Sequence, residues 1–135
     1  MRNRHRPVPI HVLVADDEPH IGRIIQTKLE QGPFRVTLVS DGPSALRALE
    51  QYADVALVLL DVMMPGLTGL NVLATMRSDA RWKDLPCIIL TAAGHDQQRD
   101  EAVRLGVNDF MTKPFSPKRL YSRVAELTVN APGAV

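Results

Sequence analysis

Short apolar runs, separated by longer amphipathic segments, constrain the fold of this chain more than any other feature. Runs of largely apolar residues occupy 10–15, 55–60, 87–90 and 107–111, and residues 34–39 alternate between apolar and polar side chains. These five segments predict strands. Between them, apolar residues recur at helical spacing, which predicts helices near 21–29, 45–49, 68–77, 96–105 and 116–127. Apolar strands that alternate with helices are typical of a parallel sheet buried on both faces. We therefore expect an α/β fold whose right-handed crossovers form a three-layer α/β/α sandwich.

The length of 135 residues fits one domain with a substantial core and is too short for two ordinary domains. Gly32 and Pro33 are expected to end the first helix, and Ser116 followed by Pro117 is typical of the start of the last one. We expect the domain to span residues 10–128, between an N-terminal tail of residues 1–9 and a C-terminal tail of residues 129–135.

The composition excludes several function classes. The formal net charge of +1 gives no argument for direct binding to nucleic acid. No apolar stretch reaches the length that spans a membrane, and the basic start lacks the apolar region of a signal peptide. The single cysteine, Cys87, lies in an apolar run and is interpreted as a buried hydrophobic residue. These features favour a cytoplasmic protein.

Polar residues follow or end the predicted strands, namely Asp16, Asp17, Asp61, Thr91 and Lys113. Because parallel strands end at one edge of the sheet, we expect these side chains to meet there. Carboxylates that crowd together repel one another unless a cation neutralises them, and Mg²⁺ favours oxygen ligands. The alternative for each residue is structural: the acids cap loops or helices, Thr91 is an ordinary strand residue, and Lys113 is solvated.

Four motifs at these strand ends resemble those of response-regulator receiver domains. They are Val14-Ala15-Asp16-Asp17-Glu18, Leu60-Asp61-Val62-Met63-Met64-Pro65-Gly66, Leu90-Thr91-Ala92-Ala93 and Lys113-Pro114-Phe115. All four occur in the order and at the spacing of that family, over residues 10–128. The resemblance implies a flavodoxin-like (βα)5 fold with strand order 2-1-3-4-5.

The resemblance also implies a role for each residue of the site. Asp61 would accept a phosphoryl group, and Thr91 and Lys113 would bind that group. Asp16, Asp17, Asp61 and the backbone carbonyl of Met63 would hold Mg²⁺. Glu18 extends the acidic run, and we interpret it as a charge facing solvent at a helix start.

Further residues match the part of the family pattern that accompanies switching. Phe110 matches the switch aromatic that moves together with Thr91, although a static aromatic at the sheet edge fits the sequence equally well. Ala92 and Ala93 are small and would leave room for the phosphoryl group. In that family, the peptide bond that corresponds to the one between Lys113 and Pro114 is typically cis. Met63 and Ala93 occupy positions that set the rate of dephosphorylation, and because neither activates water we expect a long-lived aspartyl phosphate.

The function implied by the resemblance is that of a phosphorylation switch in two-component signal transduction, not that of an enzyme. A histidine kinase or phosphotransfer protein would supply the phosphoryl group in a phosphorelay. A downstream protein or an output domain would then read the altered face between the fourth and fifth helices. The chain is either a stand-alone receiver or one excised from a larger regulator or hybrid kinase. We expect a monomer or a dimer that depends on phosphorylation, with no membrane partner.

Two other classes of protein share parts of this pattern. A haloacid-dehalogenase-like phosphatase also uses an aspartate with Thr and Lys, but its nucleophile lies on the first strand, usually with a second Asp two residues later. Here Met63 holds that second position. A flavin-binding domain of the same fold needs a phosphate loop rich in Ser, Thr and Gly after the first strand, where this chain has Asp16 and Asp17.

Overall fold

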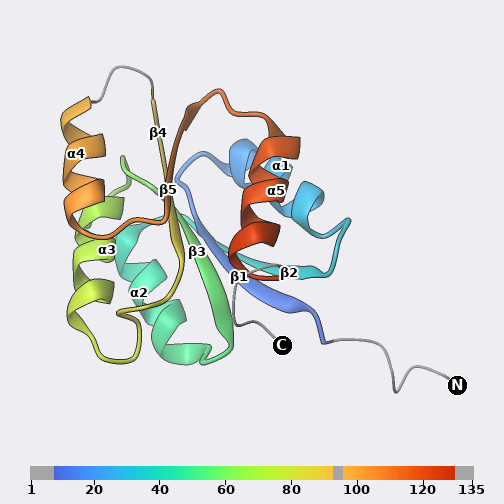
Figure 1. The fold of residues 1–135 in the computed structure, drawn as a ribbon, viewed down its shortest axis with the longest axis horizontal. Coiled ribbons are helices and arrows are strands. Elements are labelled where there is room, and N and C mark those ends of the chain that lie inside the picture. Colours follow the sequence, from blue (N-terminus) through green and yellow to red (C-terminus); the bar gives the residue numbers. More distant parts are fainter. Residues whose placement is uncertain (1–7, 93–95, 130–135) are drawn as a thin grey trace, which may run out of the picture.

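The computed structural model describes residues 8–92 and 96–129, and it contains five parallel strands and five helices that alternate along the chain (Figure 1). The strands pair in the order β2-β1-β3-β4-β5, as expected. The elements are β1 (Ile10–Ala15), α1 (Pro19–Leu29), β2 (Phe34–Val39), α2 (Gly42–Gln51), β3 (Val55–Asp61), α3 (Gly69–Ser78), β4 (Cys87–Ala92), α4 (Asp96–Arg104), β5 (Asp109–Lys113) and α5 (Pro117–Leu127).

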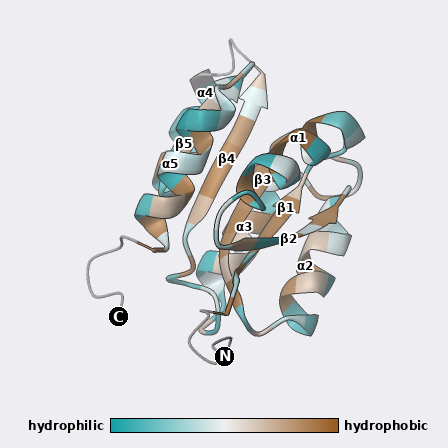
Figure 2. Ribbon diagram, turned by 90° about the vertical axis from the view of Figure 1, so that its right-hand side faces the viewer, coloured by the Kyte–Doolittle hydropathy of each residue, from teal (hydrophilic) through white to brown (hydrophobic). Residues whose placement is uncertain are grey.

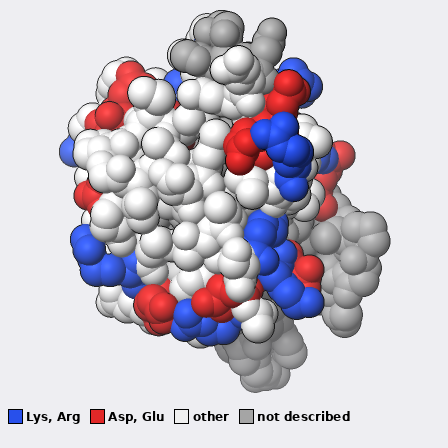
Figure 3. All heavy atoms as spheres, turned by 90° about the vertical axis from the view of Figure 1, so that its left-hand side faces the viewer, with Lys and Arg blue, Asp and Glu red and all other residues white. Residues whose placement is uncertain are grey.

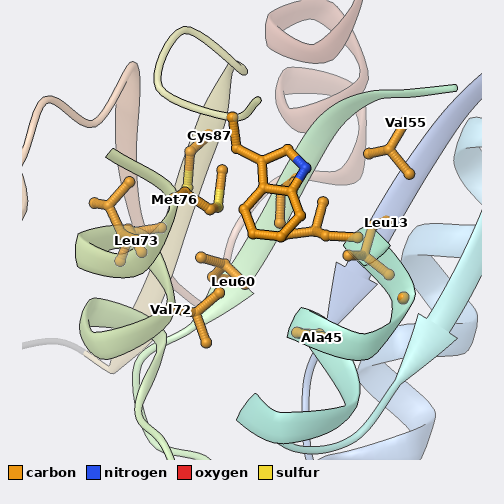
Figure 4. Packing of buried hydrophobic residues seen from close by; sticks show 14 of the residues in the cluster. Leu13, Ala45, Val55, Leu60, Val72, Leu73, Met76 and Cys87 are labelled. Carbon is orange, nitrogen blue, oxygen red and sulfur yellow. The ribbon is translucent and has the colours of Figure 1, made fainter. Parts of the chain in front are cut away.

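Helices cover both faces of the sheet and divide the core in two. On one face, buried residues of β1, β3 and β4 pack against α2, α3 and α4, and Figure 4 shows Leu60 of β3, Leu73 and Met76 of α3, and Cys87 of β4 in this layer. On the other face, the strands pack against Ile25 and Leu29 of α1 and against α5. Figure 2 shows hydrophobic strands beneath helices whose outer sides are hydrophilic. The predicted three-layer sandwich is confirmed.

Local sequence signals account for most helix starts. The Asp41 carboxylate accepts a hydrogen bond from the backbone N–H of Ser44, and Ser116 accepts one from Arg119 N–H in the same way. Thr68 and Asn71 form a reciprocal capping box at the start of α3. Such caps satisfy backbone donors that have no partner within the helix.

The expected bounds of the fifth strand were wrong. We predicted residues 107–111, whereas β5 runs from Asp109 to Lys113. Gly106 adopts a φ of +82°, and the N–H of Val107 donates to the carbonyl of Ala102, so these residues still close the turn of α4. Lys113 is consequently the last residue of the strand rather than a residue of the following loop.

At the amino edge of the sheet, buried polar groups are matched with partners. The His11 ring, which is 1% exposed, binds the Asp54 carboxylate at 2.8 Å through Nδ1 and the Thr37 hydroxyl at 2.7 Å through Nε2. The Arg77 guanidinium donates to the carbonyls of Gly106, Trp82 and Leu85 and to the side chain of Asn108. Trp82, which lies between α3 and β4, is buried in the core.

The surface agrees with the near-neutral charge of the sequence. On the side of α3 and α4, shown in Figure 3, Lys and Arg alternate with Asp and Glu around a central area that carries neither. Within residues 8–92 and 96–129, no helix has both the length and the apolar character needed to cross a membrane.

Candidate functional site

The alternation of side chains along the strands brings the expected charged residues to one place. In β3, Leu57 and Leu59 face α1 and α5, and Asp61 continues this alternation at the carboxyl end. In β5, Met111 faces the same way and Lys113 follows it by two residues. Asp16 directly follows β1, and its N–H extends the pairing with β2 by donating to the Val39 carbonyl at 3.0 Å.

The Lys113 ammonium lies among three carboxylates. Its Nζ donates hydrogen bonds to Glu18 Oε1 at 2.8 Å and to Asp61 Oδ2 at 3.1 Å. It also lies 3.0 Å from Asp16 Oδ2, a charge contact that does not meet the angular requirements of a hydrogen bond. One cation therefore faces three anions, which leaves the cluster with an excess of negative charge.

The acidic cluster fits a hard divalent cation. Ligand oxygens of Asp16, Asp17, Glu18 and Asp61 lie within 4.8 Å of one another. Asp16 and Asp61 are buried, whereas Asp17 and Glu18 are exposed. Asp16 Oδ2 is buried and accepts no hydrogen bond from the described residues, so it has a lone pair to offer a ligand. An all-oxygen donor set with a solvent-facing side suits Mg²⁺, which retains several waters.

Burial and charge shift the pKa values of the site in opposite directions. Burial, reinforced by the neighbouring Asp16 carboxylate, raises the pKa of Asp61 to about 6 despite its hydrogen bond from Lys113. Burial alone would lower the pKa of Lys113, but its contacts with the three carboxylates outweigh burial and raise the pKa. The hydrogen bond from Lys113 lowers the pKa of Glu18. At neutral pH all three groups are therefore charged.

Thr91 does not join this cluster. Cys87 and Ile89 face α3 and α4, and Thr91 continues their alternation, so its side chain lies on the opposite face from Asp61. Its hydroxyl, almost fully buried, donates a hydrogen bond to Gln98 Oε1 of α4 at 3.0 Å. The five side chains therefore do not all meet, because Thr91, one residue before the end of β4, points to the face of the sheet opposite Asp61.

The structure describes all but one of the remaining predicted residues. Phe110 is half-buried, and the Arg99 guanidinium lies 5.7 Å from the centroid of its ring. Ala92 pairs with Lys113 and is exposed, whereas Ala93 lies outside the described residues. The Met63 side chain is 59% exposed, and its N–H donates to Asp61 Oδ1 at 3.3 Å. The bond between Lys113 and Pro114 is cis, as expected.

Sequence reasoning underestimated Glu18 and missed Gln98. Glu18 does begin a helix and is half exposed, as we expected, but it also binds Lys113, a contact that the interpretation did not include. The acidic run 16–18 was the available signal for this role. Gln98 lies seven residues after Thr91, and only its place four residues before the apolar Ala102 hinted that it faces inward.

Comparisons with known proteins agree with this geometry. The family model described as the response regulator receiver domain matches residues 12–125. The phosphate regulon transcriptional regulatory protein PhoB of Klebsiella pneumoniae is 38% identical over 84% of this chain and 49% of its own length. The chain thus spans about half the length of the curated relatives it matches.

Solved structures of response regulators are also similar to this chain. A receiver domain of the Francisella response regulator 1452 superposes with a TM-score of 0.79 at 35% identity, over 87% of this chain and 94% of that one. The phosphorylated cyanobacterial phytochrome response regulator RcpA has a TM-score of 0.80 at 27% identity, over 92% of this chain and 97% of its own. The chain belongs to the response regulator receiver domain family of two-component systems.

Proposed function

We propose that this receiver domain accepts a phosphoryl group on Asp61 and that phosphorylation changes its affinity for a partner. The observation that carries the proposal is the cluster of Asp16, Asp61 and Lys113, in which a buried carboxylate oxygen lacks a hydrogen bond from any residue that the structure describes. An acid cluster kept only for stability would be expected to give such an oxygen a hydrogen bond, whereas Asp16 Oδ2 has only a charge contact with Lys113.

The proposed reaction needs an ionised Asp61. One of its oxygens attacks phosphorus, the bond from phosphorus to the phosphohistidine nitrogen of the donor breaks, and the electron pair leaves with the imidazole. Lys113 lies within 3.1 Å of Asp61 and would balance charge on the transferred group. Mg²⁺ held by Asp16, Asp17, Asp61 and the Met63 carbonyl would supply further positive charge.

The donor we propose is a histidine kinase or phosphotransfer protein. Among the similar proteins, RcpA is a phosphorylated response regulator and PhoB is a transcriptional regulator, which supports a receiver that is phosphorylated and acts on an output. We propose that residues 10–128 form the receiver, that its face from α4 to α5 contacts a downstream partner or output domain, and that it acts in the cytoplasm as a monomer or a phosphorylation-dependent dimer.

We further propose a switch with a slow reset rather than an enzyme with rapid turnover. Met63, two residues after Asp61, is largely exposed and has no group that takes a proton from water. The phosphorylated protein should persist for minutes or longer, measured as loss of the phosphoryl adduct after removal of the donor. A half-life of a few seconds would contradict this part of the proposal.

Intact mass spectrometry after incubation with acetyl phosphate and Mg²⁺ tests the proposed acceptor. Wild type should gain one phosphoryl group, Asp61→Ala should gain none, and omission of Mg²⁺ should suppress the adduct. Asp84→Ala serves as the matched control because the Asp84 side chain is 91% exposed and lies away from the site. An adduct of equal yield in Asp61→Ala would overturn the assignment.

A further inference from the structure

The Thr91 hydroxyl is engaged by α4 before any phosphoryl group arrives. Thr91 is 1% exposed, and its Oγ1 donates to Gln98 Oε1 at 3.0 Å. Gln98 is half-buried, whereas the preceding Gln97 is exposed. Ala102, one turn further along α4, is fully buried in the core beside the sheet, so Gln98 lies on the inward side of its helix.

A hydroxyl group has only one hydrogen to donate. When that hydrogen is bonded to Gln98, it is not available to a phosphoryl oxygen on Asp61. A hydrogen bond from Thr91 to the phosphoryl group would therefore replace the bond to Gln98, since Oε1 of an amide only accepts. The two interactions compete, and the first one favours the unphosphorylated arrangement.

The next residue of α4 contacts the second expected switch residue. The Arg99 guanidinium lies 5.7 Å from the centroid of the Phe110 ring, within the range of a cation–π contact. Two adjacent residues of α4 thus contact Thr91 and Phe110 in the same structure. Release of the hydroxyl would remove one of two neighbouring contacts between α4 and the edge of the sheet.

We propose that Gln98 is a positioning residue that holds the Thr91 hydroxyl away from Asp61 in the free protein and releases it when the phosphoryl group binds. This inference rests on the proposed function, because it assigns a regulatory role to a side chain beside the same site. Gln98 opposes phosphorylation by stabilising the free state, and it couples the chemistry at β3 to the position of α4.

Titration with beryllium fluoride, a mimic of the phosphoryl group, in the presence of Mg²⁺ tests the proposal. Gln98→Met keeps the length and helix propensity of the side chain but cannot accept the hydrogen bond, so it should bind the mimic about threefold to tenfold more tightly. Gln98→Glu retains an acceptor and should bind no more tightly than wild type. Gln97→Met is the matched control and should equal wild type.

A role for Gln98 in stability alone makes a different prediction. Gln98→Met would then lower the thermal midpoint and leave the affinity for beryllium fluoride unchanged or weaker, which would overturn the proposal. Tighter binding by Gln98→Glu would overturn it as well. In a Thr91→Val background, the effect of Gln98→Met should disappear, because the hydroxyl is absent.

A double-mutant cycle separates this inference from the proposed function. The unfolding free energies of the free protein with Thr91→Val, Gln98→Met and both changes should reveal coupling between the two side chains. If wild type fails to bind beryllium fluoride with Mg²⁺, the proposed function fails, and coupling in this cycle still measures the contact. Absence of coupling would overturn the role of Gln98 even if the mimic binds.

Discussion

The two edges of the sheet differ in whether their polar groups have hydrogen-bond partners. At the amino edge, both nitrogens of the His11 ring have partners, Thr37 and Asp54, and Arg77 has oxygen acceptors for its donor groups. At the carboxyl edge, Lys113 is shared among three carboxylates, and one oxygen of Asp16 has no hydrogen bond within the described part of the chain.

The pKa values express the same difference. The hydrogen bond from His11 lowers the pKa of Asp54, so folding favours its charged form. Burial raises the pKa of Asp61 to about 6, so folding favours its neutral form. The amino edge is arranged for stability, whereas the carboxyl edge retains charge that a ligand would neutralise. Such an uncompensated cluster is typical of a functional site.

The largest expected effect is at the amino edge. Arg77→Ala would remove the donor to the carbonyls of Gly106, Trp82 and Leu85 and leave them without this partner. The free energy of unfolding should fall by about 3 kcal/mol, measured by urea denaturation.

Arg47→Ala is the control for that variant because Arg47 is exposed and, among the residues that the structure describes, donates only to Ser44 of the same helix. Its expected loss is below about 0.5 kcal/mol. Phosphorylation of the folded Arg77→Ala protein should be preserved, since Arg77 does not contact the acidic cluster. Equal stability of the two variants would contradict the structural role assigned to Arg77.

A smaller loss of stability is expected for Asp54→Asn. Because the folded pKa of Asp54 lies below its ordinary value of 3.8, the charged group stabilises the protein above pH 3.8, and this contribution is lost as the pH falls toward the lowered pKa. Asp54 is 57% exposed, so the loss in the variant at pH 7 should be at most about 1 kcal/mol. Urea midpoints between pH 3 and pH 7 measure it. A difference that grows toward acid pH would contradict this sign.

The smallest effect is expected for Glu18→Gln. Glu18 is half exposed and adds negative charge beside Asp16 and Asp61, so its neutralisation should weaken Mg²⁺ binding by about twofold to threefold. Calorimetric titration with Mg²⁺ measures the change, and Glu101→Gln on α4 is the control. Tighter Mg²⁺ binding by Glu18→Gln would show that its main effect is to hold Lys113.

Much of this arrangement was accessible from the sequence because it depends on local patterns. Apolar runs located the strands, and the polar residues that end them, Asp61 and Lys113 among them, share an edge in any parallel sheet. The same reasoning placed Thr91 at the edge but did not establish which way its side chain turns. The direction of the Thr91 side chain follows from the alternation along β4, which places it on the face of the sheet that α4 covers.

Contacts between distant segments were not accessible. Glu18 and Lys113 are 95 residues apart, and Arg77 reaches Gly106 across 29 residues. Neither pairing has a periodic signal, because each depends on the packing of whole elements. The start of β5 was misplaced for a related reason, since the apolar Val107 closes the turn of α4 instead of entering the sheet.

The contrast between the two edges is tested most directly by the stability of Asp61→Asn against pH. The raised pKa means that ionisation of Asp61 costs stability as the pH rises from 3.8 through about 6. At pH 7.5 without divalent cations, the variant should be more stable than wild type by roughly 1 to 3 kcal/mol, and below pH 4 the difference should vanish.

Addition of Mg²⁺ at pH 7.5 should stabilise wild type more than Asp61→Asn. The difference between their free energies of unfolding should therefore become smaller. This result would establish that the carboxyl edge carries negative charge that a bound cation neutralises. A variant that is less stable than wild type at pH 7.5, or an equal gain from Mg²⁺ in both proteins, would contradict the account.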